Sequence, residues 1–378
     1  MKYFLTFILL STSLFAQDVD IEFYSIFHAE SESMLGKDTN TTFPKEQNSF
    51  SSLYANLSLT YDISDTLFVV AASKGNYVLG EKNYITPLYL RSILTSKDIN
   101  KVILSELSLN YDDGFYSVSL GRTDVDFDWI NGSVDGAIMM IGDDNSYSLR
   151  FFWLENFTQL QYNYYVKFQD INKNEGMYGS IATLKHGIVN FHFYDYYMKD
   201  LRNMLGANFS IGSNRFSFNS SYTATKALSL ALYDYDESFT NASLKYQFKR
   251  HLFEIGASLT GENGLLAMLQ LGNFMFGQFY LSNQVDRESA KNAFTHYTYA
   301  NRSFKLELLG GYTKYNNSFK SIQKDLTSQE LDIYLSYAFN KKFMLDFGVM
   351  AMQVDERDPI GVSQTLIMTN MVYKYESY

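Results

Sequence analysis

The stretch SFSSLYANLSLTYDIS, residues 49–64, decides the fold. From Leu53 to Tyr61 the odd positions are apolar or aromatic, whereas most even positions are polar, among them Asn56 and Ser58. A repeat of two residues places the two kinds of side chain on opposite faces of a β-strand. Because a protein core or lipid could cover the apolar face, the rest of the sequence has to decide between them.

The same alternation recurs along the whole chain. Further alternating runs surround Leu107, Leu149, Tyr164, Phe218, Leu244, Leu335 and Phe347. Some runs are joined by tight polar segments such as 112–114 and 249–251, and others by longer segments such as 77–100, 124–132 and 314–327. Short turns on one rim and long loops on the other are typical of transmembrane β-barrels. The joints within 170–214 are all short, so the pattern assigns no rim there.

Composition favours a membrane barrel over a soluble sheet. The chain has 31 Tyr and 31 Phe but only three Pro, and no apolar run reaches the roughly 20 residues of a membrane helix. Aromatic side chains gather next to the turns, as at Tyr61, Tyr111, Phe248 and Phe339, which is typical of the aromatic girdles of a barrel. We predict an all-β transmembrane antiparallel β-barrel of about 18 strands, with 16 as the alternative, having short periplasmic turns and long extracellular loops.

The N-terminus predicts export. Residues 1–16 read as a signal peptide, with Lys2 before an apolar run and Ala16 at the expected cleavage site, which leaves 17–378 as the barrel. The expected location is the bacterial outer membrane. The chain has no Cys, which excludes disulfides and thiolate metal sites. A formal charge of −10 argues against nucleic acid as a partner.

One stretch resembles a known family. SLGRTDVDFDWINGSVDGA, residues 119–137, resembles the Gly-Arg region of OprD-type outer-membrane porins, in which a Gly-Arg pair ends an early strand and a loop leads to a second strand beginning near a glycine. Gly121 and Arg122 carry the match, and Gly136 is the second glycine. The resemblance implies diffusion of small, often charged, nutrients through a waist that a loop narrows and charges line.

The same stretch sets Asp124, Asp126, Asp128 and Asp135 at the carboxylate spacing of an EF-hand loop. Trp129 stands where that loop needs glycine, so no metal is expected. Two interpretations stay open: the aspartates form an acidic rim beside Arg122 that shapes the field at the channel mouth, or they form a solvated acidic loop.

Two further groups are candidates for the channel lining. The segment 77–100 is largely apolar or aromatic, and it either folds into the barrel mouth and presents Arg91 to the passage or packs on neighbouring loops outside. Charges at inward positions either order permeating ions across the waist or only solvate the lumen and pair with one another. They are Glu106, Arg150, Lys167, Lys245, Glu254, Lys305, Glu307, Asp332 and Asp346.

These observations predict a porin: passive diffusion of small hydrophilic solutes and ions through a charge-lined, loop-constricted aqueous channel. An outer-membrane enzyme or adhesin on a barrel scaffold is one alternative. A substrate-specific uptake channel for hydrophobic compounds is another, for which Met344, Met350, Met352 and Met368 at inward positions are a hint.

The sequence shows no nucleophile motif, and its five histidines have no metal-ligand spacing, so we expect no enzyme and no cofactor. Expected partners are outer-membrane lipid and lipopolysaccharide outside, and small hydrophilic solutes or ions inside. The pattern leaves open whether the barrel is a monomer or a homo-oligomer such as a trimer.

Overall fold

The structure is a computed structural model. It describes residues 19–35, 47–82, 101–143, 145–160, 165–172, 175–228, 236–265, 283–318, 323–358 and 363–377. Within these ranges no helix is long and apolar enough to cross a membrane. The described residues form one antiparallel sheet.

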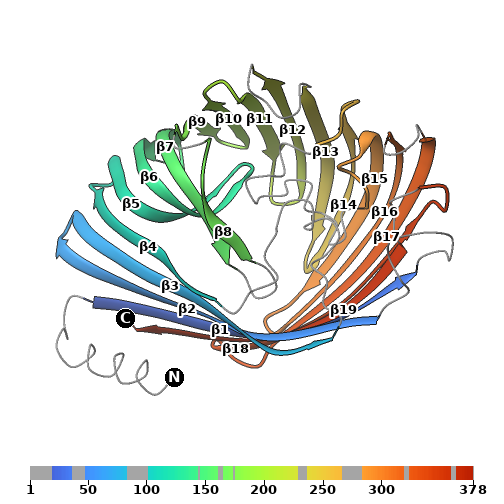
Figure 1. The fold of residues 1–378 in the computed structure, drawn as a ribbon, viewed down its shortest axis with the longest axis horizontal. Helices are drawn as coiled ribbons and strands as arrows, with labels where there is room; N and C mark the ends of the chain where they lie inside the picture. Colours follow the sequence, from blue (N-terminus) through green and yellow to red (C-terminus); the bar gives the residue numbers. More distant parts are fainter. Residues whose placement is uncertain are drawn as a thin grey trace.

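Nineteen strands make up this sheet (Figure 1). They are β1 (Val19–Leu35), β2 (Gln47–Ser64), β3 (Leu67–Lys82), β4 (Lys101–Asp112), β5 (Tyr116–Phe127), β6 (Ile130–Asp143), β7 (Tyr147–Leu160), β8 (Tyr165–Asp170), β9 (Met177–His186), β10 (Val189–Met198), β11 (Arg202–Gly212), β12 (Phe216–Ala227), β13 (Glu237–Phe248), β14 (His251–Thr260), β15 (Glu288–Ala300), β16 (Phe304–Asn317), β17 (Gln323–Ala338), β18 (Phe343–Val354) and β19 (Ser363–Ser377).

The sheet closes on itself. Strand β1 pairs with β2 on one side and with β19 on the other, so the first and last strands are neighbours. The first half of β7 pairs with β9, whereas its second half pairs with the short β8, which is therefore not one of the wall strands. The described wall is thus a closed ring of 18 strands, and the predicted strand number is confirmed.

The two rims differ in the length of their connections. One rim carries the chain ends of β1 and β19 and most of the tight turns, from 65–66 between β2 and β3 to 339–342 between β17 and β18. We call it the turn rim and the opposite one the loop rim. The joint 187–188, which the sequence pattern left unassigned, lies on the turn rim, and 199–201 lies on the loop rim.

The opening stretch has the predicted sidedness. Leu53 and Tyr61 are more than two-fifths exposed on the outside of the ring, whereas Ser52 and Tyr54 are buried on the inside. The outer face is apolar on strand after strand, with Leu109, Leu149, Leu244, Ile255, Leu331 and Ile367 all exposed there. In water such a surface would be costly, so its natural solvent is hydrocarbon.

Exposed aromatic side chains gather at the turn rim. They include Tyr61, Phe115, Tyr116, Tyr147, Phe216, Phe248 and Phe339. Rings with an apolar body and, for tyrosine, a polar end suit the boundary between lipid tails and headgroups. The girdle that the sequence predicted beside the turns is therefore present on this rim.

The hairpin of β5 and β6 leaves the wall and enters the ring. Pairing between β4 and β5 stops at Arg122, and the rest of the hairpin continues inside the barrel (Figure 1). Gly121 faces Gly136 at the bend. Gly121 has a φ of +113°, and a Cβ on Gly136 would lie 2.0 Å from the Trp153 carbonyl oxygen, so both positions require glycine.

The sequence pattern placed a long loop at 124–132, and this is corrected by the structure. The strands continue to Phe127 and restart at Ile130, which leaves a two-residue turn of Asp128 and Trp129. We call residues 122–135, together with the second half of β7 (156–160) and β8, the inner lobe. The alternation within 124–132 was interpreted as a loop because three aspartates, an asparagine and a glycine among nine residues are rare in a strand.

Candidate functional site: the inner lobe and the facing wall

The base of the inner lobe is held by Arg122. Its guanidinium forms a two-point ion pair with Asp135, with Nε at 2.7 Å from Oδ1 and Nη2 at 3.0 Å from Oδ2. Nη1 donates to the Leu104 carbonyl oxygen at 3.1 Å, and the guanidinium lies 4.3 Å from the centre of the Phe168 ring of β8. Planar two-point pairing fixes orientation as well as distance, so Arg122 ties the lobe to β4 and β8.

The tip of the lobe contacts the wall several strands away. The Trp129 indole N–H donates to the Tyr194 hydroxyl at 2.9 Å and to the Thr223 hydroxyl at 3.2 Å, and its ring is fully buried edge-on to Phe239. These partners belong to β10, β12 and β13. The tip therefore reaches the inner wall at β10 to β13, several strands away from its own hairpin.

Asp128 forms the second contact of the tip. Its carboxylate lies 2.5 Å from Nε2 of His192 and accepts a hydrogen bond from Nδ2 of Asn208 at 2.8 Å. His192 also lies 3.1 Å from the Thr183 hydroxyl through its other ring nitrogen. The turn thus combines a buried indole with an anchored carboxylate, and both fix its position.

An apolar core lies between the lobe and the wall. It contains Val125, Ile130 and Val134 from the lobe, together with Phe152, Leu154, Ile181, Tyr196 and Met204 from the wall. The glycines of the wall make room for this layer, since a Cβ on Gly179 would fall 2.0 Å from the Phe152 ring. Packing of this kind holds the lobe rigidly against one side of the lumen.

The other side of the lobe is charged. Asp124 lies 2.5 Å from Nζ of Lys74 on the inner face of β3 and accepts from the Ser133 hydroxyl at 2.9 Å. Asp126 accepts from Asn131 at 2.9 Å and is exposed. Glu106 on β4 lies close enough to Lys74 and Asp124 to interact with both. The aspartates therefore have separate partners instead of converging on one point.

A row of charges lines the inner wall from β13 to β18. Lys245 lies 3.5 Å from Glu254, and His296 lies 3.6 Å from Glu254 and 3.5 Å from Glu307. Lys305 extends the row by binding Glu307 at 2.7 Å. Asp332 and Asp346 continue it as buried carboxylates on β17 and β18. Most of these charges pair with one another.

The remaining candidates are placed as follows. Arg150 lies on the inner face of β7, with its guanidinium 5.1 Å from the Phe127 ring of the lobe. Lys167 belongs to β8, but its side chain lies outside the described residues, and Arg91 lies in a segment, 83–100, that is outside them altogether. The predicted loop 77–100 is corrected at its start, because residues 77–82 belong to β3 and pair with β2 in the wall. Whether 83–100 folds inward stays a prediction.

Sequence reasoning missed His192, Asn208 and Tyr194 as partners of the lobe. They stand 64, 80 and 65 residues from the side chains they contact. The alternation predicts that these side chains face inward, but no local sequence pattern predicts which wall strands the hairpin will contact.

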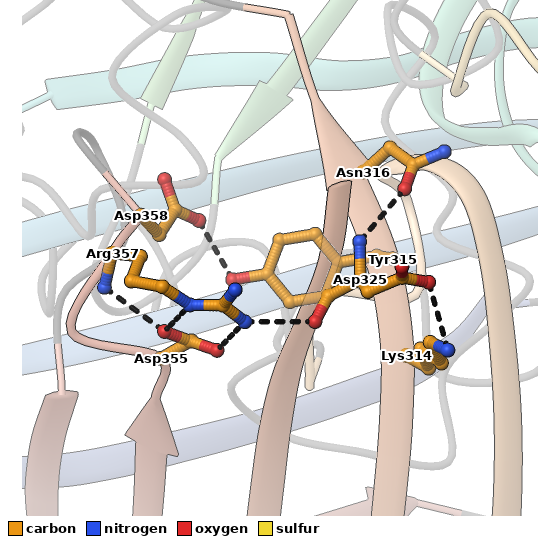
Figure 2. Close-up of polar contacts among 7 residues, drawn as sticks. All are labelled: Lys314, Tyr315, Asn316, Asp325, Asp355, Arg357 and Asp358. Atoms are coloured by element: carbon orange, nitrogen blue, oxygen red, sulfur yellow. Dashed lines mark hydrogen bonds and ion pairs between the residues drawn. The ribbon is translucent and has the colours of Figure 1, made fainter. Parts of the chain in front are cut away.

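A polar cluster joins the connections at the loop rim (Figure 2). Arg357 binds Asp355 through Nε at 3.0 Å and Nη2 at 2.7 Å, and it donates to the Asp325 carbonyl oxygen at 2.9 Å. The buried Tyr315 hydroxyl donates to Asp358 at 2.7 Å. Hydrogen bonding to Arg357 holds the pKa of Asp355 below its usual value. The segment after β18 is thereby tied to β16 and β17.

The methionines at inward positions do not form an open track in the described part of the lumen. Met350, Met352 and Met368 are buried in one cluster with Leu326 and Leu366, near the loop rim. Gln284, from the segment that precedes β15, lies 3.9 Å from the Met352 sulfur. The cluster is packed as a core, which does not favour the channel for hydrophobic compounds.

Comparison with solved structures shows which proteins share this architecture. OpdK of Pseudomonas aeruginosa, solved with vanillate, superposes with a TM-score of 0.76 at 10% identity, covering 96% of this chain and 100% of that one. OccK9 (OpdG) of the same organism gives 0.75 at 9% identity with the same coverage, and OccAB4 of Acinetobacter baumannii gives 0.71 at 14%, with 96% and 99% covered.

The fold is that of the OprD-type porins. The resemblance that Gly121 and Arg122 suggested is confirmed at this level. Comparison with protein-family models gives no match, and comparison with curated protein sequences gives none either.

Proposed function

We propose that the chain is a passive channel of the bacterial outer membrane for small hydrophilic solutes and ions. The observation that carries the proposal is the contrast between the two faces of one closed ring. The outside is apolar between exposed aromatic rings, whereas the inside carries Lys74, Glu254, Glu307, Asp346 and many amides and hydroxyls. A barrel of this width leaves an aqueous passage unless something fills it.

The inner lobe is the constriction in this proposal. It enters the lumen from β5 and β6, is anchored on β10 to β13 by Trp129 and Asp128, and presents Asp124 toward Lys74 of β3. Solutes would pass between these charges and the charge row of the facing wall. A solute would lose part of its hydration shell there, and its contacts with fixed charges and hydroxyls would offset that loss.

The sidedness and surroundings follow from the same proposal. The turn rim would face the periplasm and the loop rim the cell exterior, as in bacterial barrels generally. Lipid and lipopolysaccharide would cover the outer face. The OpdK structure holds vanillate, a small organic solute, and passage of small solutes without catalysis is the function proposed here.

Planar-bilayer recording tests the proposal. Purified full-length protein should insert to give stable, stepwise ion currents, and a salt gradient should give a reversal potential set by the lumenal charges. Protein that inserts as a folded barrel, shown by its β circular dichroism and protease resistance, and yet conducts no current would overturn the channel function.

A further inference from the structure

A recess of about 300 Å³ lies in the lumenal wall on the turn-rim side of the lobe tip. Strands β10 to β13 form it, and its inward side chains are Asn190, Asn208, Ser210, Asn219, Ser221 and Asn241. All of them are amides or hydroxyls. The volume is at the lower end of small-molecule sites, and it suits a solute of monosaccharide size.

The lining offers acceptors that the protein does not use. The amide oxygens of Asn190, Asn208 and Asn241 are buried and receive no hydrogen bond from the described residues. A buried carbonyl oxygen without a hydrogen bond carries a free-energy cost, which is relieved when a donor binds it. The serine hydroxyls can donate or accept, and asparagine amides can donate through Nδ2. A solute with several hydroxyls, each both donor and acceptor, is the chemical match.

Charge separates the recess from the rest of the lumen. The nearest part of the lobe is Asp128, whose carboxylate is already held by His192 and by the Asn208 amide. Lys245 stands on β13 beyond Ser243 and lies 3.5 Å from Glu254. Lys185 faces Asn190 across β9 and β10 but does not line the recess. The recess itself therefore has no ionised side chain for an ionic solute.

We propose that this amide-lined recess is a binding site for uncharged, polyhydroxylated solutes, which it holds after they pass the lobe. The proposal rests on the channel function and adds the class of solute. A neutral sugar exchanges its water for the amides and hydroxyls without leaving a buried charge unpaired. An anion of the same size would meet unpaired amide oxygens, which repel it.

Uptake into proteoliposomes tests the proposal with three probes that share one carbon skeleton: glucose, gluconate and glucosamine. Glucose uptake should saturate with concentration, whereas gluconate and glucosamine uptake should stay linear. Ser221→Leu fills the recess and should lower glucose uptake severalfold. Tyr222→Leu, one residue away on the outer face of β12, is the control and should leave glucose uptake unchanged.

A second variant covers the case in which Ser221→Leu does not fold. Asn241→Ala removes one unpaired amide oxygen without filling space, and it should weaken saturation by glucose while leaving conductance unchanged. Conductance is measured on every variant. Normal conductance with linear glucose uptake, or equal saturation by glucose and gluconate, would overturn the sugar site and leave the channel standing. Absence of current in folded wild-type protein would instead overturn the channel itself.

Discussion

At the scale of single residues, two glycines decide where the wall ends and the inner lobe begins. Gly121 and Gly136 face each other, and a Cβ on either would collide with a neighbouring backbone carbonyl, 2.5 Å away for Gly121 and 2.0 Å for Gly136. Backbone cannot yield as a flexible side chain can. The lobe therefore depends on two positions where any side chain is too large.

Gly136→Ala is expected to lower the free energy of unfolding by about 1–3 kcal/mol, because the new methyl group forces the hairpin away from β7. Urea denaturation of the refolded barrel measures this. Gly75→Ala on β3 is the matched control, since its Cβ would have its nearest neighbour, a Val102 side-chain carbon, at 3.5 Å. Equal stability of both variants would contradict the close approach at the bend.

At the scale of elements, closure depends on one seam, between β1 and β19. His28 is fully buried there, with Nδ1 at 2.6 Å from Oδ1 of Asn370 on β19 and Nε2 at 3.0 Å from Glu30. Fifteen residues of β1 pair with β19, so the seam is as long as any other junction of the wall. A closed ring leaves no edge strand to pair with another chain.

Engineered cysteines test this register, because the natural chain has none. Ala29 faces Thr369 across the seam, so Ala29→Cys with Thr369→Cys should form an intramolecular disulfide on mild oxidation. The disulfide is detected as a change in electrophoretic mobility between oxidised and reduced protein on a denaturing gel, run with unheated and with heated samples. Ala29→Cys with Thr365→Cys, displaced by roughly 13 Å along β19, should stay reduced. Cross-linking in the displaced pair would mean another register.

The connection after β18 gives an element-scale prediction that depends on pH. Arg357 lowers the pKa of Asp355, so the contact contributes stability above the ordinary Asp pKa of 3.8 and loses it as the pH falls through the lowered value. Hydrogen exchange of the Asp355 amide, which donates to the Thr327 carbonyl oxygen, should speed up only in that acidic range after correction for intrinsic rates.

Asp355→Asn is the companion variant, because it should show fast exchange of the same amide already at neutral pH. Asp113→Asn, in the turn between β4 and β5 on the opposite rim, is the control and should leave that amide protected. Protection of the Asp355 amide that is insensitive to both pH and Asp355→Asn would show that Arg357 does not hold this segment.

At the scale of the whole molecule, the fixed charges of the facing wall should set ion preference. Lys245→Gln removes a cation beside the buried Glu254, so the reversal potential in a salt gradient should shift toward cations. Low salt is needed, because exposed charges are screened beyond roughly 10 Å at 0.1 M. Lys341→Gln, in an exposed turn at the turn rim, should cause a much smaller shift. Equal shifts would place Lys245 away from the passage.

The barrel could be predicted from the sequence because alternate side chains of each strand suit lipid on one face and water on the other. Leu53 and Tyr61 against Asn56 and Ser58 already separate outside from inside, and chain length at roughly 20 residues per strand with its connection predicts about 18 strands. The inner lobe was beyond this reasoning. The sequence pattern placed Asp128 in a loop, and its contact with His192 depends on how the hairpin bends at Gly121.

The candidate lining shows the same limit. Glu106, Lys245 and Asp332 lie on the inner face, where parity placed them, yet parity did not reveal that Lys245 pairs with Glu254 or that Arg122 holds the base of the lobe. It also did not reveal the recess, because asparagine and serine on an inner face look like ordinary wet positions. How far along the barrel axis a side chain lies, and which residues it contacts across the lumen, are determined only by three-dimensional packing.

The most direct measurement is single-channel conductance after removal of the inner hairpin. Arg122 and Asp135 already face each other, so replacing 123–134 with Asn-Gly joins them through a two-residue turn without moving the wall. Replacing Lys249 and Arg250, the existing two-residue turn between β13 and β14, with Asn-Gly is the control. If the inner lobe narrows the passage, the shortened barrel conducts severalfold more current than the wild type and the control; conductance equal to theirs in the folded variant contradicts the account.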